Sequence, residues 1–148
     1  MGSGGESTGD AAAARPAPSE LFEDLSFLLA RANAFSLAAG NAALSEYGLR
    51  VRSYSVLALA AGTSRPSQRE LAEMLRLDPS QVVALVDELQ SRGLVVRQPD
   101  PADRRANVVV ATDLGRAVHS DAATAEAAVA ASTSLITTEA PWRASSAA

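Results

Sequence analysis

The chain has no cysteine and is poor in histidine. Among its 148 residues, His119 is the single histidine. The lack of thiolates excludes disulfides, iron–sulfur clusters, thiolate zinc sites and cysteine nucleophiles. One histidine cannot form a histidine-rich metal site, and we expect His119 to be a surface or hydrogen-bonded residue. No cofactor is therefore expected.

Aromatic residues are also scarce, at 4% of the chain, whereas alanine occurs 32 times. Alanine favours helix but fills little volume. The composition therefore predicts a mainly helical protein whose thin core a second chain would help to complete.

Long apolar runs and targeting segments are missing as well. The longest apolar run in the middle of the chain is 56–61, which is too short to cross a bilayer. The first residues lack the basic segment and apolar segment of a secretory signal. We therefore expect a soluble, cytoplasmic protein.

Lysine is absent, so all thirteen basic residues are arginine, and the net charge is −4. Residues 50–116 carry ten arginines against eight acidic residues, and both flanks are acidic. A mildly basic middle is weak evidence for an anionic partner, because solvated surface charge explains it as well.

Two regions are predicted along the chain. Residues 1–18 are rich in Gly, Ser, Ala and Pro and are expected to be a disordered tail, so that 19–148 form a single domain. Ser19 is a candidate cap for a long first helix. Its narrow heptad-like seam favours packing against a second chain over a plain core stripe. The seam comprises Leu21, Leu25, Leu28, Ala32, Phe35, Ala39 and Ala42.

Two short helices joined by a tight turn are predicted in the middle of the chain. Ser67 and Glu70 form a capping box at the start of the first. Asp78, Pro79 and Gln81 give the same kind of start to the second. Apolar residues recur where two steeply crossing helices would bury their contact, at Leu71, Leu75, Leu77, Val82 and Leu85.

Further elements flank this pair. A helix over 53–61 precedes it, and strands at 94–97 and 108–110 follow it with a ten-residue loop between them. Thr112 caps a last helix that is expected to extend to about residue 131. The helix over 53–61 is expected to bury Tyr54, Leu57, Ala58 and Ala61.

The order of elements, α-α-α-α-β-β-α, is typical of a winged helix-turn-helix. In that arrangement the second helix of the pair enters the DNA major groove with its N-terminal residues at the base edges. Gln81 is suited to adenine, and Val83 and Ala84 to a thymine methyl group. The predicted base contacts are Ser80, Gln81, Val83 and Ala84.

Phosphate contacts are predicted beside the first helix of the pair and in the wing, the hairpin of residues 98–107. Free amides near Ser67 and Gln68 can hold a phosphate. Arg104 and Arg105 suit a narrow minor groove, and Asp103 is expected to hold one of the tip arginines by a charge-assisted hydrogen bond. Three arginines are left open between phosphate contact and ordinary helix-end charge: Arg69, Arg97 and Arg116.

Several short segments match the pattern of one family of regulators. The chain resembles the MarR family of bacterial transcriptional regulators over about residues 19–131. The most specific part is the Asp-Arg wing motif followed by a Thr-x-x-Gly-Arg helix start, and it makes Asp103 and Arg105 the matching wing residues. The segments are 47–49, 54–57, 68–75, 77–82, 92–95, 100–105 and 112–116.

The resemblance implies a homodimer on a pseudo-palindromic operator and a small phenolic or lipophilic ligand that lowers DNA affinity. The DNA-binding lobe would span about 50–112, and the dimerisation helices about 19–46 and 113–140. Because the family's ligand pocket lies between these parts, Phe35 and Tyr54 are candidate ligand contacts, although both residue types are more often core.

Some positions depart from the family pattern. Arg76 stands where the turn usually has glycine, and Glu88 where a basic residue is common. Residues 135–139 resemble the start of a further apolar helix that Pro141 would end. We therefore expect modest DNA affinity that depends on wing and phosphate contacts.

The sequence thus favours a dimeric, ligand-responsive repressor, with residues 79–92 in the major groove. No nucleophile elbow, phosphate-binding glycine loop or metal cluster supports an enzyme. The alternative is a winged-helix protein-interaction module with weak or no DNA binding, which the acidic recognition helix keeps open.

Overall fold

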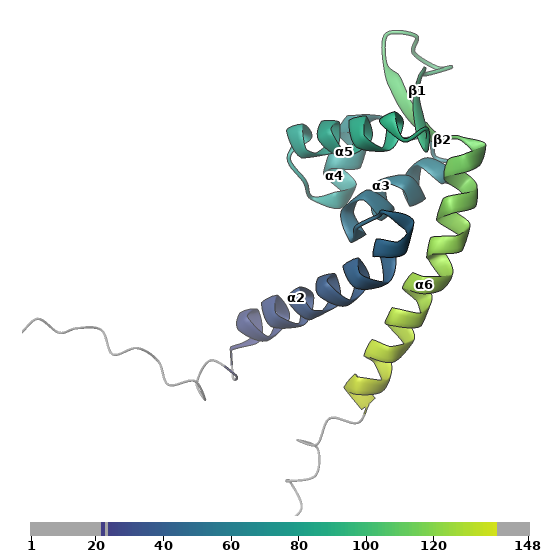
Figure 1. Cartoon of the computed structure of the whole chain (residues 1–148). Helices are drawn as coiled ribbons and strands as arrows, with labels where there is room; N and C mark the ends of the chain where they lie inside the picture. The colour runs from purple at the N-terminus through teal and green to yellow at the C-terminus, as the bar shows by residue number, and fades with distance from the viewer. Residues whose placement is uncertain (1–21, 23, 139–148) are drawn as a thin grey trace, which may run out of the picture. The chain divides into compact units, whose positions relative to one another are not determined.

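The structure is a computed structural model that describes residue 22 and residues 24–138, with side chains up to residue 131 (Figure 1). The predicted tail, Ser19, Leu21 and Pro141 lie outside the described residues. The chain forms two compact units, 1–35 and 36–148.

Helix α2 (Leu25–Leu44) is the predicted long first helix. The Asp24 carboxylate accepts a hydrogen bond from the Phe27 amide at 2.9 Å, so Asp24 caps the observed start of the helix. A short 3-10 turn, η1 (Ser45–Tyr47), follows α2.

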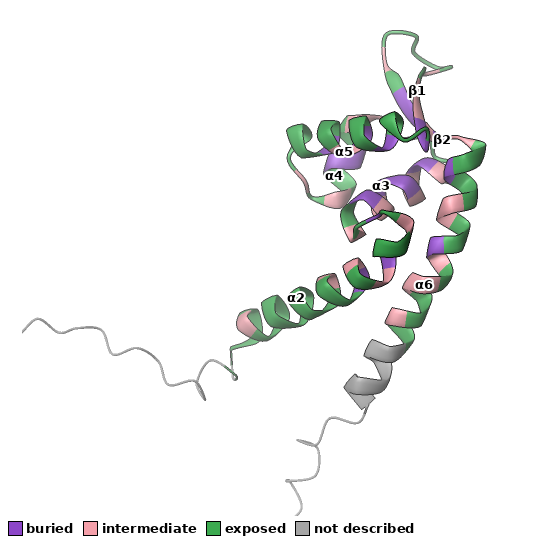
Figure 2. Ribbon diagram, viewed as in Figure 1, coloured by how far each residue is buried: buried purple, intermediate pink, exposed green. Residues whose placement is uncertain are grey.

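Three helices form the centre of the second unit: α3 (Val51–Ala61), α4 (Gln68–Leu75) and α5 (Pro79–Ser91). Both predicted helix starts are confirmed, at residues 68 and 79. Figure 2 shows the buried residues gathered where these helices and the hairpin meet. The largest fully buried side chains are Leu44, Leu49, Val56, Leu57, Leu71, Val82, Val86, Leu89, Val95 and Val109.

The buried face of α3 differs from the prediction. The buried residues are Ser53, Val56, Leu57 and Ala60, whereas Tyr54, Ala58 and Ala61 are only half-buried. The cause is that α3 contacts both α5 and α6, so two of its sides are covered. A pattern that assumes one buried face cannot place such a helix correctly.

The hairpin consists of β1 (Val95–Pro99) and β2 (Asn107–Ala111), which pair in antiparallel register from Val95–Ala111 to Pro99–Asn107. Both strands are longer than predicted, so the loop is 100–106 rather than ten residues. The Val109 amide donates to the Pro66 carbonyl oxygen at 2.8 Å, which ties the hairpin to the start of α4.

Helix α6 (Asp113–Thr138) begins at the predicted cap, where Thr112 Oγ1 accepts from the Gly115 amide at 3.0 Å. The helix is longer than the predicted end at 131. The prediction of a separate helix starting at residue 135 is wrong, since 135–138 continue α6. The alanine-rich stretch has no helix-breaking residue before Pro141, which explains the extension. The predicted mainly α, winged helix-turn-helix fold is confirmed.

Candidate nucleic-acid interface

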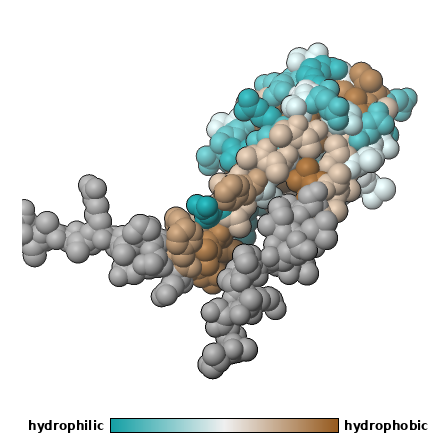
Figure 3. Space-filling model, turned by 60° about the horizontal axis from the view of Figure 1, so that its bottom comes forward, coloured by the Kyte–Doolittle hydropathy of each residue, from teal (hydrophilic) through white to brown (hydrophobic). Residues whose placement is uncertain are grey.

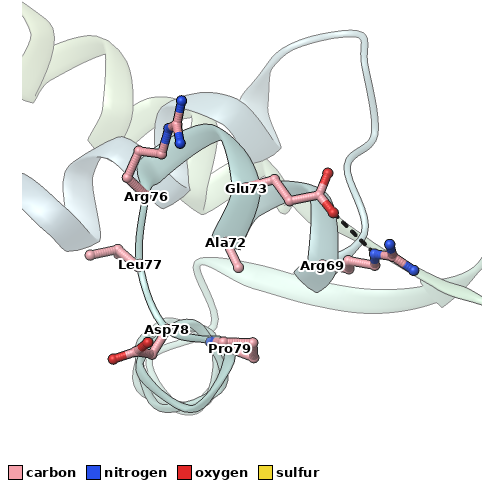
Figure 4. A pocket seen from close by; sticks show the side chains of 7 residues that line it. All are labelled: Arg69, Ala72, Glu73, Arg76, Leu77, Asp78 and Pro79. Carbon is pink, nitrogen blue, oxygen red and sulfur yellow. Dashed lines mark hydrogen bonds and ion pairs between the residues drawn. The ribbon is translucent and has the colours of Figure 1, made fainter.

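The turn between α4 and α5 contains Arg76 in the left-handed conformation, with φ 53° and ψ 43°. This conformation explains why the family pattern has glycine here, since glycine adopts it without strain. A cavity of about 790 Å³ lies at this turn. Figure 4 shows the side chains that line it, with Ala72 facing the start of α5. The buried Ala72 is small and so leaves room for α5 to approach.

The first turns of α5 expose the four predicted base contacts: Ser80, Gln81, Val83 and Ala84. Gln81 has a second task, because its Oε1 accepts a hydrogen bond from the Asp78 amide at 3.2 Å. This leaves the amide nitrogen of Gln81 free to donate. Because an amide oxygen can accept two hydrogen bonds, Gln81 can keep this cap while its amide group pairs with adenine.

A groove of about 410 Å³ joins the start of α4 to the base of the wing. The first-turn amides of Gln68 and Arg69 have no acceptor within the helix, because of their position. The groove thus unites the predicted phosphate contacts on α4 with Arg97 on β1. Its lining residues are Ser67, Gln68, Arg69, Arg97, Ala106, Asn107 and Val109.

A carboxylate occupies the positive end of α4. Glu70 Oε2 accepts from the amide and the hydroxyl of Ser67 at 2.7 and 2.8 Å. These hydrogen bonds hold the pKa of Glu70 below its ordinary value, and the bond from the Ser67 amide has the larger effect. The Glu70 charge offsets part of the attraction of this helix end for a phosphate.

The three arginines left open by the sequence have different environments. Arg69 forms an exposed ion pair with Glu73 at 3.0 Å, which a phosphate can replace. Arg116 donates to the Ala61 carbonyl oxygen at 2.7 Å and so caps the end of α3. Arg97 is held by three side chains of α4 and α5.

The wing tip is shaped by two aspartates. Asp100 Oδ1 accepts from the Ala102 amide at 2.8 Å, and Asp103 Oδ1 from the Arg105 amide at 3.0 Å. The predicted bond from Asp103 to an arginine side chain is therefore replaced by a backbone turn, to which short polar side chains are suited. In the described part of the chain, the exposed guanidinium groups of Arg104 and Arg105 have no hydrogen-bond or ion-pair partner.

The two predicted ligand contacts belong to different units. Phe35 lies in the first, is 63% exposed, and has the Arg31 guanidinium 5.1 Å from its ring centre. Tyr54 lies in the second and stacks on His119 with ring centres 5.5 Å apart. Burial, and then the charge of Glu126, raise the pKa of Tyr54. The stacking partner of His119 could not be predicted from a lone histidine.

A second cavity, of about 570 Å³, lies between the end of α2, the start of α3 and α5. It includes Arg50 and Arg52, whose guanidinium groups are exposed and unpaired within the described residues. No sequence motif marks either arginine, so neither was predicted as a site residue. The lining also includes Leu37, Asn41, Gly48, Val51, Ser53, Leu85 and Glu88.

Helix α2 carries an exposed apolar stripe, and its surface is largely hydrophobic in Figure 3. Leu25 is 70% exposed and Leu29 61%. Solvent-exposed large apolar side chains in a row typically mark an interaction surface. The other exposed members on α2 are Leu28 and Phe35.

No group of three or more potential metal ligands occurs in the described part of the chain. None of the helices within the described residues is long and apolar enough to span a membrane.

Comparison with known proteins agrees with this geometry. A crystal structure of CouR from Rhodococcus jostii RHA1 bound to p-coumaroyl-CoA is 50% identical in sequence to this chain. The match covers 74% of this chain and 77% of the CouR chain, with a TM-score of 0.68. A structure of CouR bound to a 23-mer DNA duplex is 32% identical. That match covers 76% of this chain and 80% of the other, with a TM-score of 0.69.

A curated relative from Thauera aromatica is described as a putative transcriptional regulatory protein for the hcr operon. It is 38% identical over 52 residues, and this match spans 35% of the present chain and only 31% of the relative.

The family itself is identified by two matches. A MarR-family transcriptional regulator from Rhodococcus sp. RHA1 is 47% identical. The match covers 78% of this chain and 79% of that regulator's chain, with a TM-score of 0.69. Residues 47–106 match the sequence model of the MarR family. The chain belongs to the MarR family of transcriptional regulators.

Proposed function

We propose that the protein is a dimeric, ligand-responsive transcriptional repressor that binds a pseudo-palindromic operator. The observation that carries the proposal is the groove between the start of α4 and the base of the wing. It brings together the first-turn amides of α4 and the exposed Arg69 at the base of the wing, and the wing beyond it carries two unpaired arginines. Because a bacterial transcriptional repressor binds chromosomal DNA, the proposed function places the protein in the cytoplasm.

The proposed mode of DNA binding assigns one groove to each element. Residues 79–92 enter the major groove, and the wing of residues 98–107 follows the flanking minor groove. The apolar stripe of α2 supports a second copy of the chain as partner, because that stripe is exposed in one copy. A dimer then presents its two recognition helices about 34–36 Å apart, one turn of DNA.

The proposed effector is a phenolic or lipophilic aromatic compound. The support is CouR bound to p-coumaroyl-CoA, at 50% identity, and the cavity that combines Leu37 and Leu85 with unpaired arginines. An effector that binds better to a dimer with a different spacing of recognition helices releases DNA without entering the groove.

The alternative of a protein-interaction module rested on the acidity of α5. Two of its carboxylates have basic partners, since Asp87 lies 2.6 Å from Arg97 and Glu88 lies 3.9 Å from Arg92. These pairs reduce the repulsion that α5 exerts on DNA phosphates. The local charge therefore favours DNA binding over the alternative.

Selection of random DNA duplexes by the purified protein, followed by sequencing, tests the proposal. We expect enrichment of a pseudo-palindrome whose half-sites lie one helical turn apart, and p-coumaroyl-CoA is the first effector to test for release. Replacing Gln81 by Ala should change the selected bases. Recovery of unselected sequence at low salt would contradict a sequence-specific regulator.

A further inference from the structure

Arg97 lies in the middle of β1 and is held by side chains of both helices of the helix-turn-helix. Its Nε donates to Gln68 Oε1 at 2.7 Å, and its Nη1 to Gln90 Oε1 at 3.0 Å. Its Nη2 donates to Asp87 Oδ1 at 2.6 Å and forms an ion pair there. All three guanidinium nitrogens are thus engaged.

These partners come from the elements that a DNA-binding winged helix must hold in register. Gln68 is the first residue of α4, in the groove at the base of the wing. Asp87 and Gln90 are one turn apart on α5, so they lie on one side of that helix. The Arg97 side chain, 25% exposed, therefore connects the wing to both helices.

The planar guanidinium is required for this arrangement. It presents its donors in a rigid fork, so one side chain can bind three acceptors that point in different directions. A lysine has one nitrogen at this position and cannot reproduce the fork. These three hydrogen bonds use three of the five N–H donors of Arg97, and the side chain is only 25% exposed, so little of the guanidinium is left for a phosphate.

We propose that Arg97 is a positioning residue, which fixes recognition helix α5 and the wing at the relative angle that DNA binding needs, and that it is not a phosphate contact. This inference rests on the proposed function. It assigns Arg97 to the internal structure of the interface, and it leaves phosphate contact to Arg69 and the wing arginines.

The substitution Asp87→Asn tests the proposal by the sign of its effect. On charge alone, removal of a carboxylate from the recognition helix strengthens DNA binding. The substitution leaves a neutral oxygen that can still accept from Arg97 but removes the charge that strengthens this bond, so α5 is held less firmly and DNA binding weakens by about tenfold. Glu88→Gln is the matched control, because it removes the same charge from the next residue, which does not contact Arg97. We expect equal or tighter DNA binding for this control.

The salt dependence of binding separates positioning from phosphate contact. Loss of one phosphate contact lowers the slope of log affinity against log salt by about 0.9. We expect Arg105→Ala to lower the slope by about that amount. Arg97→Ala and Arg97→Lys should weaken binding to a similar degree as each other and leave the slope unchanged.

Amide hydrogen exchange on the DNA-free protein tests the role of Arg97 independently of DNA binding, and so independently of the proposed function. Arg97→Ala should lower the protection of amides in β1 and α5, and Gln90→Ala should do so more weakly. Three results would each overturn the proposal. They are unchanged amide protection in Arg97→Ala, tighter DNA binding by Asp87→Asn, and a smaller salt slope for Arg97→Ala. If the wild-type protein binds no DNA while Arg97→Ala still loses amide protection, the proposed function alone is refuted.

Discussion

Arg92, at the end of the recognition helix, donates to the carbonyl oxygens of Gly48 and Tyr47 at 2.6 and 2.8 Å. These carbonyls belong to the turn that follows α2, far away in the sequence. The end of α5 is therefore attached to the end of the helix that carries the exposed apolar stripe.

Removal of this attachment should cost stability. We expect Arg92→Ala to lower the free energy of unfolding by about 1–3 kcal/mol, because two charge-assisted hydrogen bonds to carbonyl oxygens are lost. Urea denaturation followed by circular dichroism measures this. Arg104→Ala is the matched control, since its side chain is exposed at the wing tip, and it should leave the midpoint unchanged. Equal midpoints for Arg92→Ala and wild type would contradict the structural role.

Gly115 is required by close packing. A Cβ at this position would collide with the carbonyl oxygen of Leu94, whereas one at Gly62 meets only ordinary or slightly tight contacts. Gly115→Ala should therefore destabilise the protein by about 1–3 kcal/mol or more, and Gly62→Ala should be close to neutral. Thermal melting of the two variants checks the difference. A Gly115→Ala protein as stable as Gly62→Ala would show that α6 does not approach the hairpin so closely.

The capping box of α4 makes stability depend on pH. The pKa of Glu70 is lowered in the folded protein by the amide and hydroxyl of Ser67, so its contribution is present above the ordinary pKa of 4.5. That contribution is lost as the pH falls through the lowered pKa. Ser67→Ala should cost about 1 kcal/mol at pH 7 and flatten the pH dependence below 4.5.

Urea unfolding at several pH values tests the capping box. Ser80→Ala serves as control, because Ser80 is exposed at the start of α5 and its side chain has no hydrogen bond in the described structure. Glu70→Gln should show the same flattened acid response. An unaltered pH profile in Ser67→Ala would mean that the box does not set the Glu70 pKa.

The apolar stripe of α2 should control assembly. Leu29 is exposed on the stripe, and Ala34 lies on the opposite side of the helix at 100° per residue. Leu29→Glu should shift the dimer toward monomer and lower DNA affinity, whereas Ala34→Glu should do neither. Analytical ultracentrifugation over a range of concentrations measures the shift. A fully dimeric Leu29→Glu protein would place the interface elsewhere.

Local patterns in the sequence predicted the elements well where the signal is local. The capping residues Ser67 and Asp78 located α4 and α5, and Thr112 located α6. Alternating apolar residues could not show that α3 is covered on two sides. The partners of Arg97 are separated from it in the sequence by up to 29 residues, so its role depends on tertiary packing.

The candidate DNA contacts illustrate the same limit. Helical periodicity predicts that Ser80, Val83 and Ala84 are exposed, and all three are exposed in the structure. The interaction of Asp103 with a backbone amide depends on the conformation of the wing tip. Residue type alone did not distinguish this turn from an ion pair.

The most direct measurement is a titration of the protein with DNA from upstream of its own gene, beside a random duplex, at two salt concentrations. We predict preferential binding to the upstream DNA and a steep loss of affinity at the higher salt, because phosphate contacts release counterions. Binding without preference and with little dependence on salt would contradict a DNA-binding regulator and support the protein-interaction alternative.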